Sequence, residues 1–367
     1  MAEKAIRLGG ESTADAIVSA VDAMYTEHTF AESDFALKHN DDEIAVDTNF
    51  AAQSFWKDAL IRFFGKKSAV LGLILIVVIV LLAVLGPGMN SYTYSGQDLS
   101  QKNFAPRVPG LEQFGILDGS EKMSTTTGTK VTNAYQEKGK LDVYYWFGSD
   151  LYGRDIWTRT WEGARVSLII AVAAAVIDMV IGMSYGLISG YFGGRVDMVM
   201  QRFLEVANGI PRLVIVTLLL LVLQPGMVTI IFALMLTEWV GMSRIARAEM
   251  LKLKDQEFVL ASRTLGAGSF FIIFKEVLPN IIGPIITQVM FSIPTAIFTE
   301  AFLSFVGLGI PVPQCSLGSL ISELYNSFTT HPYQIIPPIV VMSLLMLSFN
   351  LVADGLREAL DPKMKSM

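Results

Sequence analysis

Residues 258–280 read FVLASRTLGAGSFFIIFKEVLPN and lie between two strongly apolar segments of a very hydrophobic chain. The stretch is amphipathic and mildly basic, and it closes with Leu278-Pro279. Apolar residues recur at helical spacing before Gly266 and again from Phe270 to Val277. Because glycine can adopt the left-handed conformation that ends a helix, the stretch predicts a helix, a break at Gly266 and a second helix along a membrane face.

The composition excludes an ordinary soluble protein. Of 367 residues, 52% are hydrophobic and only 17% are charged. Segments of about 20 apolar residues recur, and each is long enough to cross a bilayer. The net charge of −6 is uneven, since residues 1–60 hold twelve acidic and four basic side chains. We expect an acidic tail that is not a cleavable signal peptide. Basic residues are too dispersed for nucleic acid.

The sequence also lacks the usual patterns of an enzyme or a metalloprotein. Cys315 is the only cysteine, and the three histidines at 28, 39 and 331 are far apart in sequence. A disulfide within the chain or a cysteine metal site is therefore excluded. The sequence contains no G-x-x-x-x-G-K-[ST] phosphate loop. We expect no cofactor in this chain and no nucleotide hydrolysis by it.

Charge-free segments predict the membrane spans. We expect the first at about 69–88, where the cations just before it favour an internal N-terminus, and the second at about 166–190. Residues 213–237 form either one span or two short ones hinged at 224–226. Lys and Arg precede and follow this region, and both groups favour the cytoplasm. The chain should therefore cross twice here.

Two further spans complete the prediction. They are expected at about 282–306 and 334–354, after Pro279 ends the preceding helix and leads into the fifth span. The connection 307–332 contains no Lys or Arg, as an external segment should. Cations after residue 354 place the C-terminus inside. The result is an all-α polytopic membrane protein with six spans and both termini cytoplasmic.

The sequence GMSYG at 182–186 fits the G-x-S-x-G nucleophile elbow. That motif requires a strand-turn-helix and a histidine partner, whereas this one lies inside a predicted span. Gly182, Gly186 and Gly190 are four residues apart, which would let two helices approach closely. Helix packing is therefore the preferred interpretation.

Three carboxylates fall within predicted spans: Asp178, Glu238 and Glu300. Such groups are costly in a membrane and usually face a partner or a wet cavity. They could line a translocation pathway, or they could be hydrogen-bonded packing groups. For Glu238 a third possibility is an ion pair with Arg244 or Arg247.

The opening stretch resembles a known family. Leu260-Ala261-Ser262, Gly266 and Leu278-Pro279 are similar to the Glu-Ala-Ala…Gly…Leu-Pro loop of ABC importer permeases. The chain departs from that pattern at two positions, because Leu260 replaces the Glu and Ser262 replaces the second Ala. An ion pair through the family's Glu is therefore not expected here.

Four other blocks resemble one branch of that family, the second permease subunit of oligopeptide and dipeptide importers. Each block is similar to a characteristic segment of the branch, and together with the loop they run in order over about 145–363. They are WFGSDLYGRDIWTRTWEGARVSL (146–168), GYFGGRVDMVMQRFLEVANGIPR (190–212), EAFLSFVGLGIPVP (300–313) and FNLVADGLREALDPK (349–363).

The resemblance implies a mechanism and a set of partners. It implies the type I ABC importer fold, a homologous second permease, two cytoplasmic P-loop ATPases that bind ATP and Mg, and an extracytoplasmic peptide-binding protein. A coupling helix at about 256–268 would transmit ATP-driven motion to the bundle. The residues carried over for this coupling are Glu257, Ala261, Ser262, Gly266, Ala267, Leu278 and Pro279. Glu300, which lies in a matched block, and Asp178 would line the pathway.

The resemblance also divides the chain and leaves the substrate open. The same architecture could carry nickel or another small solute, and a self-sufficient secondary transporter or an intramembrane hydrolase are weaker alternatives. The expected parts are an acidic cytoplasmic tail (1–65), a first transmembrane helix (66–90), an extracytoplasmic loop or cap (91–162), an ABC type-1 transmembrane domain (163–355, with the coupling loop at about 250–280) and a cytoplasmic C-terminal tail (356–367).

Overall fold

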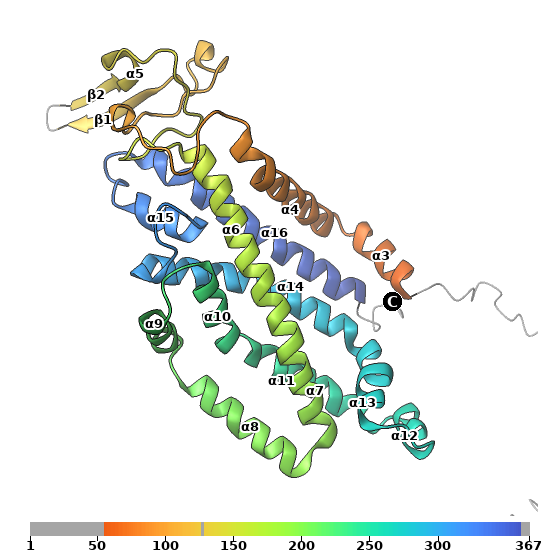
Figure 1. Cartoon of the computed structure of the whole chain (residues 1–367). Coiled ribbons are helices and arrows are strands. Elements are labelled where there is room, and N and C mark those ends of the chain that lie inside the picture. The colour runs from red at the N-terminus through yellow and green to blue at the C-terminus, as the bar shows by residue number, and fades with distance from the viewer. Residues whose placement is uncertain (1–54, 126–127, 361–367) are drawn as a thin grey trace, which may run out of the picture. The chain divides into compact units, whose positions relative to one another are not determined.

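The structure is a computed structural model, and it describes residues 55–360 apart from 126 and 127. All of the described residues belong to one compact unit of the chain, Ser54–Met367. Most of the expected acidic tail and the last seven residues of the expected C-terminal tail therefore lie outside the described part. The described unit is a bundle of long helices with a small β-hairpin at one end (Figure 1).

In the part of the chain that the structure describes, five helical segments are long and apolar enough to cross a membrane. They are Lys67–Gly88, Ile156–Phe192, Met227–Leu253, Ser269–Leu308 and Pro332–Leu360. A sixth span exists if the helices Gly194–Gly209 and Arg212–Val222, which are bent by 78° relative to each other, form one crossing. Within the described residues, the chain is thus the expected polytopic helical membrane protein.

The first span, α4 (Lys67–Leu85), packs against the last helix, α16 (Ile336–Leu360). Glycines make the contact close: a Cβ on Gly72 would lie 2.8 Å from the Ser348 carbonyl oxygen, and one on Gly355 would lie 2.3 Å from the Ala69 Cβ. The short helix α3 (Phe55–Gly65) precedes α4 and packs against α16 through Phe63.

The second span begins earlier than expected. Helix α6 (Ile156–Ile177) starts at the N-cap Asp155, whose carboxylate accepts a bond from the Thr158 backbone N–H at 2.8 Å. A π-helical segment, η5 (Asp178–Gly182), joins it to α7 (Met183–Phe192). The predicted span 166–190 therefore lies within a longer helical segment, Ile156–Phe192.

The glycines of GMSYG serve packing, as predicted. They face α11 (Trp239–Leu253), and a Cβ on Gly182 or Gly186 would lie 2.5 or 2.2 Å from a backbone carbonyl oxygen of that helix. A Cβ on Gly190 would lie 2.9 Å from the Met250 Cβ. These distances are shorter than any normal contact, so α7 and α11 require glycine at these positions.

The predicted hinge at 224–226 is present, but its flanking helices differ from the prediction. Helix α9 (Arg212–Val222) ends before the hinge, and α10 (Met227–Thr237) follows it. Eleven residues reach only about 16 Å, half of a hydrocarbon core of about 30 Å. A crossing must therefore include α8 (Gly194–Gly209), which Pro211 separates from α9 because proline lacks the N–H that a continuous helix needs.

The loop before the fifth span is shorter than predicted. Helix α11 continues to Leu253, and after α12 (Glu257–Thr264) a new helical segment begins at Ser269. This segment comprises α13 (Ser269–Phe271), the π segment η6 (Ile272–Val277) and α14 (Leu278–Leu303). Pro279 does not stop the helix, contrary to expectation. The π segment η6 ends at Val277 and α14 begins at the next residue, so Pro279, which lacks an N–H, lies in the first turn of α14.

The segment between α4 and α6 was expected to be a loop or cap, and it folds into a small subdomain with its own core. Strands β1 (Ser120–Thr125) and β2 (Gly128–Asn133) pair antiparallel, and α5 (Ala134–Glu137) follows. The short 3₁₀ helices are η2 (Gly86–Gly88), η3 (Leu99–Gln101) and η4 (Glu112–Phe114). Phe104, Tyr135 and Tyr145 form its core. The hairpin lies within the segment 91–162 that was expected to form an extracytoplasmic loop or cap.

Helix α15 (Leu317–Tyr325) lies between the last two spans. It follows the π segment η7 (Ser304–Leu308) and precedes the 3₁₀ helix η8 (Pro332–Gln334). Ser316 caps it in a capping box with Ser319. Close packing fixes α15 on two sides, because a Cβ on Gly163 would lie 3.0 Å from Ser316 and one on Gly318 would lie 2.3 Å from Ala301.

Candidate functional site

Helix α12 projects at the end of the bundle opposite the β-hairpin (Figure 1). One residue anchors it: Val259 is fully buried, in a cluster with Leu187 of α7, Met250 of α11 and Ile272 of η6. The Arg263 guanidinium adds a cation–π contact, 5.5 Å from the centre of the Tyr191 ring. Buried side chains therefore connect α12 to three helical segments of the bundle.

The end of α12 is a Schellman motif built around Gly266. The Ala267 N–H donates to the Ser262 carbonyl and the Gly266 N–H to the Arg263 carbonyl, both at 3.0 Å. Gly266 has a φ of +83°, and no atom lies within 4 Å of where its Cβ would be. Conformation, rather than space, therefore requires glycine here. The helix-ending role predicted for this residue is confirmed.

Three apolar residues of α12 and its C-cap are exposed: Phe258, Leu260 and Leu265, the last of which is 87% exposed. The polar Glu257 and Thr264 are exposed as well. Exposed apolar groups beside the basic Arg263 are typical of a surface that another protein or a membrane interface covers. This arrangement can serve as a mechanical contact, because force applied to α12 reaches the bundle through Val259.

The seven predicted coupling residues form two groups. Glu257, Ala261, Ser262, Gly266 and Ala267 lie on α12 and its cap, where the first two are exposed. Leu278 and Pro279 lie in the first turn of α14, on the far side of η6. Pro279 lines a cavity of about 1160 Å³ between α3, α11, α14 and α16.

Glu300 is a buried cross-link between three segments. Its carboxylate accepts hydrogen bonds from the hydroxyls of Ser316 at 2.5 Å, Ser304 at 2.7 Å and Ser167 at 3.2 Å. These partners lie on the N-cap of α15, on η7 and on α6, and Glu300 itself is on α14. The side chain is 1% exposed. This geometry is that of a hydrogen-bonded packing group; the lining of a pathway by Glu300 stays a prediction.

Asp178 and Glu238 have other partners. Asp178 begins η5, is buried, and accepts a hydrogen bond from the Ser292 hydroxyl of α14. Glu238 pairs with Arg212 at 2.6 Å instead of with Arg244 or Arg247. The geometry of Asp178 thus also fits a packing group, and a role in a pathway stays a prediction for it as well.

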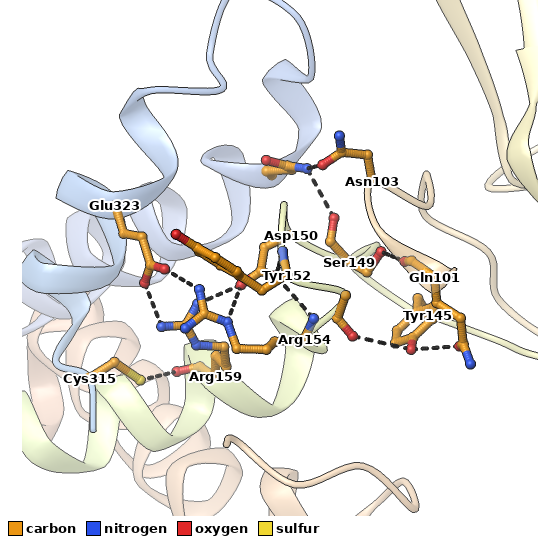
Figure 2. A network of polar contacts seen from close by, with 12 residues as sticks. Gln101, Asn103, Tyr145, Ser149, Asp150, Tyr152, Arg154, Arg159, Cys315 and Glu323 are labelled. Atoms are coloured by element: carbon orange, nitrogen blue, oxygen red, sulfur yellow. Dashed lines mark hydrogen bonds and ion pairs between the residues drawn. The ribbon is translucent and has the colours of Figure 1, made fainter. Parts of the chain in front are cut away.

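Sequence reasoning missed a four-charge network between the subdomain, α6 and α15 (Figure 2). Asp150 accepts bonds from Arg154 at 2.6 Å and from Arg159 at 2.7 Å, and both guanidinium groups also bind the carboxylate of Glu323, at 2.6 Å for Arg159. Three of the four side chains are almost completely buried, and Glu323 is 25% exposed. Burial by itself would raise the pKa of Glu323, but the two arginines hold it below the ordinary glutamate value.

The network continues from these charges into the subdomain. The Ser149 hydroxyl donates to the Gln101 carbonyl at 2.6 Å, and the Gln334 amide donates to the Ser149 carbonyl at 2.9 Å (Figure 2). The Cys315 thiol donates to the Arg159 carbonyl at 3.5 Å, and burial raises the pKa of this thiol. Polar groups therefore join α6, α15, η8 and the subdomain into one body.

Comparison with known proteins identifies the family. Residues 182–366, half of the chain, match the family described as binding-protein-dependent transport system inner membrane component. The chain belongs to this family. Residues 54–106 also match the N-terminal TM domain of oligopeptide transport permease C. This confirms the family that the sequence motifs indicated, and the multi-pass fold agrees with it.

Individual relatives of this inner membrane component cover most of its length. The oligopeptide transport system permease protein OppC of Bacillus subtilis is 42% identical over 312 residues, which are 85% of this chain and 91% of that protein. The dipeptide transport system permease protein DppC of the same organism is 39% identical over 90% of this chain and 93% of its own. One chain of the MetNI methionine ABC transporter in an inward facing conformation has a TM-score of 0.46 at 18% identity, covering 55% of this chain and 94% of that chain.

Proposed function

We propose that this chain is a permease subunit of an ATP-driven importer of oligopeptides or dipeptides, coupled to separate cytoplasmic ATPases through α12. The observation that carries the proposal is the construction of α12. It is anchored at Val259 and closed by the Gly266 cap, and it exposes Phe258, Leu260 and Leu265 without a partner among the described residues. Family membership supports the transport role, and two relatives named as peptide permeases support the substrate class.

The path for coupling runs through buried side chains. Val259 belongs to the same buried cluster as Ile272 and Val277 of η6, and η6 continues directly into α14. The cluster also includes Leu187 of α7 and Met250 of α11. Motion of α12 would therefore move these helices together, as rigid-body coupling between two conformations requires.

The partners follow from the same proposal. Two ATPases would bind ATP and Mg and contact α12 of this chain and the equivalent helix of a homologous second permease. A peptide-binding protein would deliver substrate at the end that carries the β-hairpin. That end would then be extracytoplasmic, and both termini would be cytoplasmic. This orientation agrees with the cations that flank the spans at the α12 end.

Leu265→Asp tests the coupling role. Leu265 is exposed and outside the buried clusters, so the variant should fold normally. In proteoliposomes that hold the complete complex, we expect peptide uptake to fall at least tenfold, with loss of ATPase co-purification or uncoupled ATP hydrolysis. Leu141→Asp, at an exposed apolar residue of the subdomain at the opposite end, is the matched control for ATPase co-purification. Normal uptake by Leu265→Asp would refute the assignment of α12.

A second measurement tests the substrate class separately. Uptake of labelled dipeptides, longer peptides and Ni²⁺ should be compared in the same proteoliposomes, with ATP and with a non-hydrolysable analogue inside. The proposal requires ATP-dependent peptide uptake. ATP-dependent Ni²⁺ uptake without peptide uptake would leave the coupling intact and overturn the substrate.

A further inference from the structure

The cavity of about 1160 Å³ lies at the α12 end of the bundle, in a wall of α3, α11, α14 and α16. It is partly open to the surroundings. On α14 its lining runs from Pro279 to Phe291, which is about 18 Å at the rise of an α-helix. One leaflet of a hydrocarbon core is about 15 Å thick. The cavity thus has the depth of a single leaflet.

The charged residues that line the cavity are mostly basic. Arg357 is exposed and has no acidic partner among the residues that the structure describes. Lys252 also lines the cavity, and its ammonium pairs with Glu249 at 2.6 Å while remaining 65% exposed. These two cations and the one carboxylate leave a net positive charge. An anion at this position would supply the missing counter-charge for Arg357.

The wall of the cavity is mixed. Its apolar residues include Ile282, Pro284, Phe291 and Leu360, and its uncharged polar residues are Asn280, Thr287 and Gln288. A cavity that combines a net positive charge with apolar wall residues matches a molecule with an anionic head and a hydrocarbon chain. Basic pockets between transmembrane helices are known to bind phospholipid headgroups.

Helix α3 places the α12 end of the cavity at the level of the headgroups. Leu60, Ile61 and Phe64 are exposed on one side of this helix, while Phe63 is buried against α16. Trp56, which lines the cavity, is also half exposed. Exposed apolar residues and a tryptophan on a short amphipathic helix are typical of a helix that lies in the membrane interface.

We propose that this cavity binds an anionic phospholipid, with the phosphate between Arg357 and Lys252 and an acyl chain along α14. The inference concerns a lipid that stays bound to the bundle, and it does not depend on which solute is transported. The phosphate chemistry alone could also suit a free phosphate ester. A peptide in transit is the competing occupant of the same space, and the experiment separates the three.

The test counts bound lipid by native mass spectrometry. The full-length chain is purified in mild detergent with the subunits that accompany it, and phosphatidylglycerol or phosphatidylcholine is titrated in. Each interfacial cation changes lipid affinity roughly fivefold. Arg357→Gln with Lys252→Gln should therefore weaken phosphatidylglycerol binding about 25-fold, with phosphatidylcholine binding unchanged. Arg244→Gln with Lys275→Gln removes two exposed cations that do not line the cavity and should leave binding unchanged.

A third variant separates the cavity from general surface charge. Gln288→Trp fills the cavity without changing the charge, and it should abolish the bound lipid while Arg357 and Lys252 remain. Equal losses in the control pair, or full lipid binding by Gln288→Trp, would overturn the proposal. So would displacement of the lipid by glycerol phosphate or by a transported peptide, since these results would assign the cavity to a small anion or to the substrate. Thermal midpoints verify that each variant is folded.

Discussion

The buried network between α6 and α15 allows a quantitative prediction. Glu323→Gln removes one of the two acidic partners of Arg154 and Arg159, which are 3% and 0% exposed. Asp150 then remains as the single carboxylate beside two buried guanidinium groups. Breaking a buried ion pair by removing one partner costs about 3–5 kcal/mol. The cost should lie near the lower value, because Glu323 is 25% exposed and water can partly replace it.

The assay is thermal unfolding of the purified protein, followed by tryptophan fluorescence. At about 2–4 °C per kcal/mol for a domain of this size, Glu323→Gln should lower the midpoint by about 10 °C. Glu205→Gln breaks the exposed pair with Arg202, whose side chains are 75% and 57% exposed, and should shift the midpoint by about 2 °C or less.

A compensating variant tests the cause. Combining Glu323→Gln with Arg159→Met removes one charge of each sign and leaves Arg154 paired with Asp150. Because buried ion pairs can often be replaced by apolar groups, the double variant should recover at least half of the decrease in unfolding midpoint that Glu323→Gln causes. A single variant that unfolds within about 2 °C of the parent, or a double variant that is less stable than the single one, would refute the account of unpaired buried charge.

Three further predictions concern pH, packing and the α12 cap. In the folded state the pKa of Glu323 is lowered from its ordinary value of 4.5, so the stability that this carboxylate contributes is fully present above pH 4.5 and is lost as the pH falls below it. The difference in unfolding midpoint between the parent and Glu323→Gln should therefore be constant from pH 7 to 5 and shrink at lower pH. A constant difference down to pH 3 would contradict this. Gly186→Ala places a Cβ 2.2 Å from the Ser243 carbonyl oxygen and should prevent recovery of folded protein, as judged by fluorescence-detected size-exclusion chromatography. Gly241→Ala, which has open space around its Cβ, should leave the elution profile unchanged. Equal profiles for the two variants would refute the packing argument. Gly266→Ala should cost about 1–2 kcal/mol of local stability and raise hydrogen exchange of the α12 amides about 5- to 30-fold, and unchanged exchange would show that the cap does not hold the helix.

The long spans were predictable because bilayer thickness imposes a strong pattern on sequence. Charge-free runs of about 20 residues marked most of them, and the break at 224–226 was visible from Pro225 and Gly226. The four-residue spacing of the glycines from Gly182 to Gly190 correctly indicated a close helix contact. In these cases a local pattern determines the structure, so the sequence is sufficient.

The buried polar groups were not predictable in the same way. Arg159 and Glu323 are 164 residues apart, and the serines that bind Glu300 lie on three different segments. A sequence shows that a carboxylate is in an apolar stretch, but it does not show which distant group satisfies it. The one available signal was Glu323 itself, a charged residue within the otherwise uncharged segment 307–332.

The π segments explain why the prediction failed closest to α12. The apolar stripe from Phe270 to Val277 was assigned on a period of 3.6 residues, which holds only while each turn has its normal width. In η6 each turn is wider, so residues after its start face a different direction than a regular helix would give. Ile273 and Val277 of the predicted stripe are buried together with Ile272, whereas Phe270 and Phe274 of the stripe are exposed. The wider turns therefore keep Ile272, Ile273 and Val277 on the buried side and leave Phe274 exposed.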